Sequence, residues 1–181
     1  MSTTENQTDK PYDIATTEIE KLLEIIPPAP QIRIGHFSDK GEALPRVLSR
    51  FCEENDYSYL LNCTDQSYYH TMLPRYEAAA HTTVKAFDLN RPNYMQHGKF
   101  YDYLFVSCTI PAQESAAFLQ KSHRVIKNAG LILLFLPKDD AQAREEWEGL
   151  LEEHYFVATS HIDLDERWQV IISKKMHGWG G

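Results

Sequence analysis

The chain has 181 residues, and its 43% hydrophobic content is enough for one domain with one core. It carries 18 basic against 26 acidic side chains, and this net charge of -8 disfavours nucleic-acid binding through neutralised phosphates. No apolar run approaches the roughly 20 residues needed to cross a bilayer, and the first residues have neither the basic start nor the apolar segment of a secretory signal. We therefore expect a cytoplasmic protein with no membrane part.

Cysteine and histidine spacing gives no sign of a disulfide framework or a metal site. Cys52, Cys63 and Cys108 are odd in number, widely separated and form no CxxC pair. The nearest approach to a ligand cluster is His161, Asp163 and Asp165, which alternate as at the end of a strand. We interpret that run as a solvent-exposed sheet edge and expect no metal.

The polarity of the N-terminal part divides it into two segments. Residues 1–12 are polar without periodicity, which predicts a disordered start. Within residues 13–29, an apolar stripe at helical spacing predicts a helical extension, with Thr17 and Glu20 at the spacing of a capping box. The helix should stop at Pro27, because proline removes a backbone donor. Residues 30–181 should form the remaining domain.

From residue 31 onward, β-type runs alternate with helical patterns. The fourth and fifth runs are apolar on both faces, as expected of central parallel strands covered by helices on both sides. We expect the third helix to bend or break at Pro74, and Gly130 to supply a positive φ after a helix ending near Lys127. The expected strands are 31–35, 57–63, 81–89, 101–110 and 131–137, followed by an antiparallel hairpin of 155–164 and 167–175.

Five β/α units followed by a hairpin resemble the class I S-adenosylmethionine (SAM) dependent methyltransferases over residues 30–175. The segment Lys127–Leu131 is similar to the turn that usually precedes the fifth strand of that family. The resemblance implies an α/β, Rossmann-like, seven-stranded and mostly parallel sheet of order 3-2-1-4-5-7-6, with only the last strand antiparallel and helices on both faces. A ligand should bind at the carboxyl ends of strands one to four.

The same resemblance implies that SAM lies against the first βα loop, through a glycine-rich turn that admits close backbone contact. Gly35 then takes the place of the first family glycine, Phe37 takes that of the second, and Ser38 follows, while Gly41 lies too far along to replace the lost glycine. Two interpretations stay open: an unusual SAM loop, or a loop that no longer binds SAM.

Further cofactor contacts implied by the resemblance follow the second, third and fourth strands. Asp65 would accept the ribose hydroxyls, with Asn62 as the alternative and a helix N-cap as a second, compatible role for Asp65. Asp88 would accept from the adenine amine, unless it is an ordinary loop aspartate. Ser107 could face the pocket, but the Asn/Asp-Pro-Pro-aromatic turn of many amino-methylating members is missing, and we identify no catalytic base.

Our first hypothesis is a SAM-dependent methyltransferase of unknown substrate, acting on a small molecule or a protein. The alternative is a non-catalytic, methyltransferase-like interaction module that has lost SAM binding, and a weaker one is another doubly wound α/β protein. The chain could also form a homodimer. The many tyrosines between residues 57 and 103 either line a substrate cavity or pack core and interface.

Overall fold

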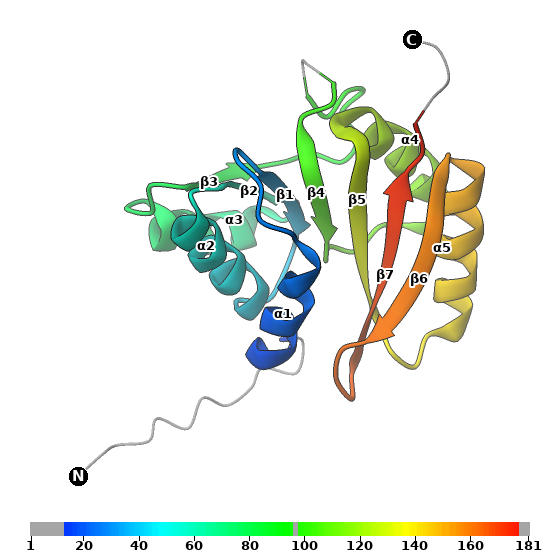
Figure 1. The fold of residues 1–181 in the computed structure, drawn as a ribbon, viewed down its shortest axis with the longest axis horizontal. Coiled ribbons are helices and arrows are strands. Elements are labelled where there is room, and N and C mark those ends of the chain that lie inside the picture. Colours follow the sequence, from blue (N-terminus) through cyan, green and yellow to red (C-terminus); the bar gives the residue numbers. More distant parts are fainter. Residues whose placement is uncertain (1–12, 96–97, 178–181) are drawn as a thin grey trace.

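A computed structural model describes residues 13–95 and 98–177, so the expected disorder of residues 1–12 lies outside the described part. The elements alternate as a β/α protein requires (Figure 1). The helices are α1 (Thr16–Leu22), α2 (Ala43–Asn55), α3 (Gln66–Tyr76), α4 (Ser115–Val125) and α5 (Ala141–Glu153), with short 3-10 turns at Leu23–Ile25 and Ala112–Glu114. The strands are β1 (Arg33–Ser38), β2 (Ser58–Cys63), β3 (Thr82–Ala86), β4 (Tyr101–Val106), β5 (Ile126–Pro137), β6 (Phe156–Asp163) and β7 (Trp168–Lys175).

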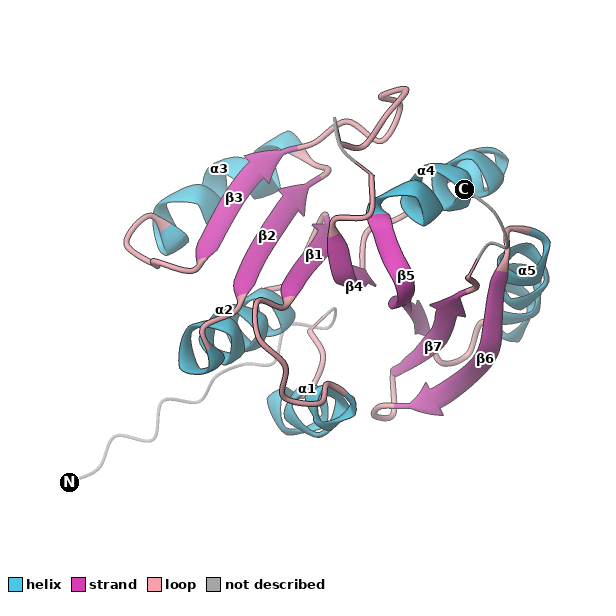
Figure 2. Cartoon of the chain, turned by 45° about the horizontal axis from the view of Figure 1, so that its top comes forward, coloured by secondary structure: helices cyan, strands magenta, loops and turns pink. Residues whose placement is uncertain are grey.

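The seven strands form one sheet of order β3-β2-β1-β4-β5-β7-β6, as predicted. The pairs among β1 to β5 are parallel, whereas β7 runs antiparallel to both β5 and β6. Figure 2 shows α1 and α2 on one face of the sheet and α4 and α5 on the other. The expected fold class and strand order are therefore confirmed.

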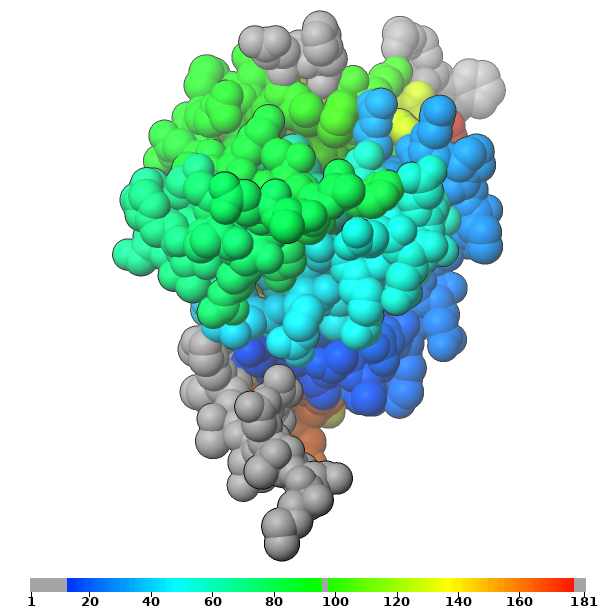
Figure 3. Space-filling view, turned by 90° about the vertical axis from the view of Figure 1, so that its left-hand side faces the viewer, coloured from blue at the N-terminus to red at the C-terminus, as the bar shows by residue number. Residues whose placement is uncertain are grey.

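Side-chain alternation along the strands builds a core on each face. Ile34 of β1 points into the core under α1, α2 and α3, while Phe37 joins the core under α4 and α5. The N-terminal helix belongs to the first of these cores through Ile19 and Leu22, and in the space-filling view its dark blue surface lies directly against α2 in cyan (Figure 3). The N-terminal helix thus extends the domain rather than standing apart from it.

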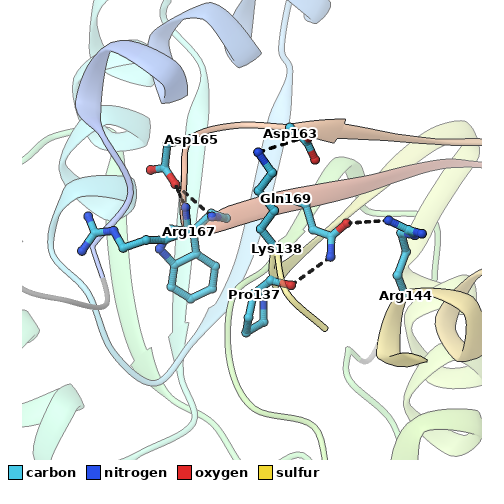
Figure 4. Close-up of polar contacts among 8 residues, drawn as sticks. Pro137, Lys138, Arg144, Asp163, Asp165, Arg167 and Gln169 are labelled. Carbon is cyan, nitrogen blue, oxygen red and sulfur yellow. Dashed lines mark hydrogen bonds and ion pairs between the residues drawn. The ribbon is translucent and has the colours of Figure 1, made fainter. Parts of the chain in front are cut away.

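The terminal hairpin is fixed at its turn and against its neighbours. Asp165 Oδ1 accepts backbone N–H groups from Arg167 (2.8 Å) and Trp168 (2.9 Å), which closes the turn between β6 and β7 (Figure 4). The fully buried Gln169 donates to the carbonyl of Pro137 (2.8 Å) and accepts from Arg144 (3.4 Å), so it ties β7 to β5 and α5. The predicted hairpin is confirmed, and the run around His161 is an exposed edge strand.

Two local predictions are wrong, and the structure excludes one alternative of a third. The N-cap of α1 is Ala15, and no side chain caps it, so Thr17 and Glu20 form no capping box. Helix α3 is not broken at Pro74 but continues to Tyr76, and the proline removes only its own backbone donor from the helix. Strand β5 begins at Ile126, and Ala129, not Gly130, has the positive φ, of 65°.

Gly130 is required for space rather than for its backbone angle. A Cβ atom there would lie 2.6 Å from the Ile126 side chain and 2.9 Å from the carbonyl oxygen of Asp102. The residue therefore lets β5 bend close to β4, where the strand register shifts.

Candidate functional site

Carboxylates follow three neighbouring strands at one edge of the sheet. Asp39 comes directly after β1, Asp65 lies two residues beyond β2, and Asp88 lies two residues beyond β3. Because parallel strands end at the same edge, these side chains lie along the crevice where open α/β sheets bind ligands. Asp65 and Asp88 are exposed there.

The turn after β1 differs from the one that the sequence indicated. Gly35, Phe37 and Ser38 lie inside β1, so the turn into α2 consists of residues 39–42. Its glycine is Gly41, whose φ of 89° only glycine adopts readily. Gly35 has a packing role instead, because a Cβ atom there would lie 2.6 Å from the ring of Tyr101.

Phe37 is a core residue in this structure. Its side chain is 1% exposed, and its ring centroid lies 4.8 Å from that of Phe87, 5.3 Å from that of Tyr94 and 5.8 Å from that of Phe118. The β3–β4 connection therefore folds over the end of β1 and contacts this ring. Ser38 is also fully buried, so neither side chain is available to a cofactor without rearrangement.

A carboxylate from the N-terminal segment caps helix α2. Asp13 Oδ1 accepts the backbone N–H groups of Glu42 (2.8 Å) and Ala43 (3.1 Å), which are unsatisfied donors of the first turn. The segment is held from its other side by the β6–β7 turn, since Arg167 donates to the carbonyl of Asp13 and Asp165 accepts from the N–H of Ala15. Asp13 thus occupies a helix N-terminus at the crevice, the kind of position that favours bound anions.

Asp65 and Asp88 each accept one local backbone hydrogen bond. Asp65 caps α3 by accepting the N–H of Tyr68 (2.8 Å), and Asp88 accepts the N–H of Asn90 (2.9 Å). Each carboxylate still faces solvent and can take further donors. The alternative ribose residue, Asn62, is only 2% exposed within β2. Of the two positions, only Asp65 is accessible to a ligand.

Asp39 is the more unusual carboxylate. Its Oδ2 accepts the N–H of Thr109 (2.9 Å) and so connects the ends of β1 and β4. Its Oδ1 is buried and has no hydrogen-bond partner among the described residues. A buried carboxylate oxygen without a donor costs free energy, so this position favours a ligand that donates a hydrogen bond or carries a positive charge.

A buried polar network lies beneath the turn. The ring of the fully buried His36 contacts Tyr59 OH through Nδ1 (2.8 Å) and Ser107 Oγ through Nε2 (2.7 Å). Ser107 donates its only hydroxyl proton to Ser38 Oγ (3.1 Å), so His36 Nε2 must donate to Ser107 and Nδ1 must accept from Tyr59. Burial lowers the pKa of His36 to about 3, so the ring is neutral at physiological pH.

The network continues to the turn itself. Ser38 Oγ contacts the carbonyl of Lys40 (3.0 Å) and Tyr68 OH (3.3 Å), and Tyr68 donates to the carbonyl of Gly41 (2.7 Å). Strands β1 and β2, helix α3 and the residue that follows β4 are thereby joined to the backbone of the turn. His36 was not among the predicted site residues; a histidine between Gly35 and Phe37 inside the first strand run is the signal that could have found it.

Ser107 also lines a cavity of about 280 Å³ at the ends of β4 and β5. Thr109, Trp147 and Trp168 are among its walls, so it is mostly apolar with a few polar groups. This is the composition of a small-molecule subsite, and it lies next to the carboxylate-lined crevice. Among the described residues no group of three His, Cys, Asp or Glu side chains could hold a metal ion, and no described helix is long and apolar enough to cross a membrane.

Comparison with solved structures assigns the fold. The chain is similar to the CurJ carbon methyltransferase (TM-score 0.68, 12% identity, 88% of this chain and 52% of that chain). It is also similar to a SAM-dependent O-methyltransferase from Thermotoga maritima (TM-score 0.68, 13% identity, 91% and 67%). A third match is the cyclase SpnF (TM-score 0.71, 10% identity, 90% and 81%).

The chain therefore has the fold of the class I SAM-dependent methyltransferases, as the sequence indicated. It spans about half the length of the first three similar structures, which are the CurJ and DszA carbon methyltransferases and the CMeT domain of the citrinin polyketide synthase. No protein-family model matches the sequence, and neither does any curated protein. Because one structure of this fold is a cyclase, the fold alone does not set the reaction.

The crevice suits the nucleoside part of SAM, but it does not accept the methionine part as it stands. Exposed Asp65 and Asp88 suit a nucleoside, and the unpartnered oxygen of Asp39 suits an ammonium group. The N–H groups at the start of α2, which would face the carboxylate of the methionine part, already bind Asp13. The methionine part therefore fits only after Asp13 has released them.

Proposed function

We propose that this protein is a SAM-dependent methyltransferase that acts on a small molecule or a protein. The observation that carries the proposal is the row of carboxylates at the ends of β1, β2 and β3, with one buried oxygen of Asp39 left without a donor. Asp65 would bind the ribose hydroxyls, Asp88 the adenine amine and Asp39 the ammonium group. Bound SAM would supply the methyl group.

The residues at the end of β4 would align the acceptor. Ser107 and Thr109 border the cavity of about 280 Å³, whose apolar walls exclude water from a bound substrate. Methyl transfer from a sulfonium relies mainly on proximity and alignment, so a base beside the acceptor is not essential. Carbon, oxygen and nitrogen acceptors all agree with this requirement.

A second candidate function is a non-catalytic interaction module. Phe37 is sealed among three aromatic rings, and Asp13 supplies from within the chain the carboxylate that a cofactor would otherwise bring. Both features stabilise a cofactor-free fold. The two functions make different predictions for removal of the Asp13 side chain: the enzyme should then bind SAM more tightly, whereas the interaction module should still not bind it.

Calorimetry of the full chain with SAM and its demethylated product, S-adenosylhomocysteine, distinguishes them. Asp13→Ala should strengthen binding, because it frees the N–H groups of Glu42 and Ala43. Asp65→Ala should weaken binding by about 1.5–3 kcal/mol through loss of charged hydrogen bonds. Asp139→Ala is the matched control, since it removes the same charge from an exposed turn.

The enzyme proposal fails if neither the natural chain nor Asp13→Ala gives heat or a thermal shift with millimolar SAM. A ligand selective for the native state must stabilise it once its concentration exceeds its dissociation constant. The absence of any binding signal in both proteins would favour the interaction module.

A further inference from the structure

A large cavity lies at the opposite edge of the sheet. Its volume is about 890 Å³, within the usual range for small-molecule sites. Lys99 precedes β4, Arg124 lies in the last turn of α4, and Lys175 ends the antiparallel strand β7, so all three lie at the amino edge of the parallel strands. Arg91, in the β3–β4 connection, completes the cationic wall. This position is remote from the carboxylates after β1, β2 and β3.

The charge of the cavity is the reverse of that of the chain. Its walls carry four cationic side chains, Arg91, Lys99, Arg124 and Lys175, whereas the chain as a whole has a net charge of -8. None of the described residues that line the cavity is acidic. Such a local concentration of positive charge raises the local concentration of anions.

Lys175 lies at the inner wall without a counter-charge. The residue is 5% exposed, and its Nζ donates to the carbonyls of His123 (2.5 Å) and Ile126 (2.7 Å). An ammonium group has three donors, and the described residues offer this one no carboxylate. Burial and the charge of Lys99 both lower its pKa. A buried charge is costly unless it is compensated, and a bound anion would compensate it.

His123 adds a neutral donor to the same wall. Its ring packs edge-on against Phe156 and Tyr155, and its Nε2 is buried without a hydrogen-bond partner among the described residues. Burial, Lys175 and His154 lower its pKa to about 4. The neutral ring adds no charge to the cationic wall, and its unsatisfied Nε2 gains a partner only if the wall rearranges around a ligand.

The remaining walls suit an organic group. Pro92, Met95 and Val125 provide apolar surface, and the Arg91 guanidinium lies 5.2 Å from the ring centroid of Phe87, which orients it. Arginine forks match the oxygens of a phosphate group in a bidentate way. An inorganic ion would leave most of this cavity unfilled.

We infer that the amino-edge cavity binds a phosphorylated small molecule, with Arg91, Lys99 and Arg124 on the phosphate and the apolar wall on the organic part. Lys175 and His123 form the base of the site. The net acidity of the chain argues against a nucleic acid as the ligand, because a long polyanion would be repelled beyond the cavity. The inference does not depend on SAM binding, since the two sites use different residues.

Calorimetry of the full chain with phenyl phosphate, inorganic phosphate and benzoate tests it. Phenyl phosphate should bind saturably and more tightly than inorganic phosphate, which lacks the apolar group, or benzoate, which has a single negative charge. The double variant Lys99→Ala/Arg124→Ala should weaken phenyl phosphate binding at least tenfold. Both side chains are exposed, so their removal leaves the core intact.

The control is Arg50→Ala/Lys138→Ala, which removes the same charge from exposed positions outside the cavity, where the partners are Glu20 and Asp163. It should leave the affinity within twofold. The inference is overturned if phenyl phosphate shows no saturable binding at 10 mM, a concentration about ten times the millimolar dissociation constant of a weak site. Equal losses in both double variants would also overturn it, because they would show only a response to net charge.

Discussion

Buried His36 should make the stability of this protein strongly dependent on pH. Its pKa is lowered from 6.5 to about 3 by burial, so the unfolded chain binds a proton between these values and the folded chain does not. The stability conferred by neutral His36 is therefore complete above pH 6.5 and is lost as pH falls toward 3. For a fully buried group with this shift, the loss between pH 7 and pH 5 is about 2 kcal/mol.

The test compares the natural chain with His36→Gln by urea unfolding at pH 7 and pH 5. Glutamine can still contact Tyr59 and Ser107 but does not titrate. The variant should be less stable at pH 7, yet its stability should fall by about 2 kcal/mol less on acidification. All other titrating groups are common to both proteins, so their contributions cancel. His70→Gln, which replaces an exposed histidine, should behave like the natural chain. An unchanged difference between pH 7 and pH 5 in His36→Gln would refute the reasoning.

Two packing predictions follow from β1. Gly35→Ala should destabilise the fold by about 1–3 kcal/mol, because the added Cβ atom would lie 2.6 Å from the buried Tyr101 ring. The control is Gly149→Ala in α5, whose Cβ atom would meet nothing within 4 Å and which should stabilise the helix by up to about 1 kcal/mol. Thermal unfolding of the two variants checks both predictions. Equal effects on stability would contradict the packing role of Gly35 against Tyr101. Phe37→Ala should cost about 3–5 kcal/mol in urea unfolding, because the ring is fully packed; a loss below about 1 kcal/mol would show that the ring is not core.

The sheet could be predicted because its signals are local. Strands β4 and β5 are apolar on both faces, and Asp165 closes the hairpin turn within three residues of itself. Even the error at Ala129 is small in scale: the backbone turns at the expected place, but as a distortion inside β5 rather than after a helix. Gly130 was singled out correctly, for the wrong physical reason.

The site could be predicted only in part, because its main contacts join distant residues. Asp13 reaches Glu42 across 29 positions, and Ser107 reaches Ser38 across 69. No periodicity or turn preference encodes such pairs. Asp65 and Asp88 lie at the edge where the resemblance placed them, although their binding roles are still predictions. The first strand was expected to end at Gly35, whereas β1 extends three residues beyond it, to Ser38.

In the function proposed above, SAM binding is a competition between two carboxylates, that of Asp13 and that of the cofactor, for the N-terminus of α2. Asp13 is tethered to the domain, so its effective concentration at the N–H groups of α2 is far higher than that of a free ligand, and a cofactor must displace it at a cost. Loss of a helix cap costs about 1 kcal/mol, which is small beside the binding energy available from the nucleoside contacts. Displacement is therefore energetically feasible, provided that the tether to Arg167 and Asp165 yields as well. That tether comes from the β6–β7 turn, so a ligand that displaces Asp13 must also break or strain these two contacts. The proposed catalytic function therefore predicts that Asp13→Ala changes SAM binding, which makes the N-terminal segment the first element to test.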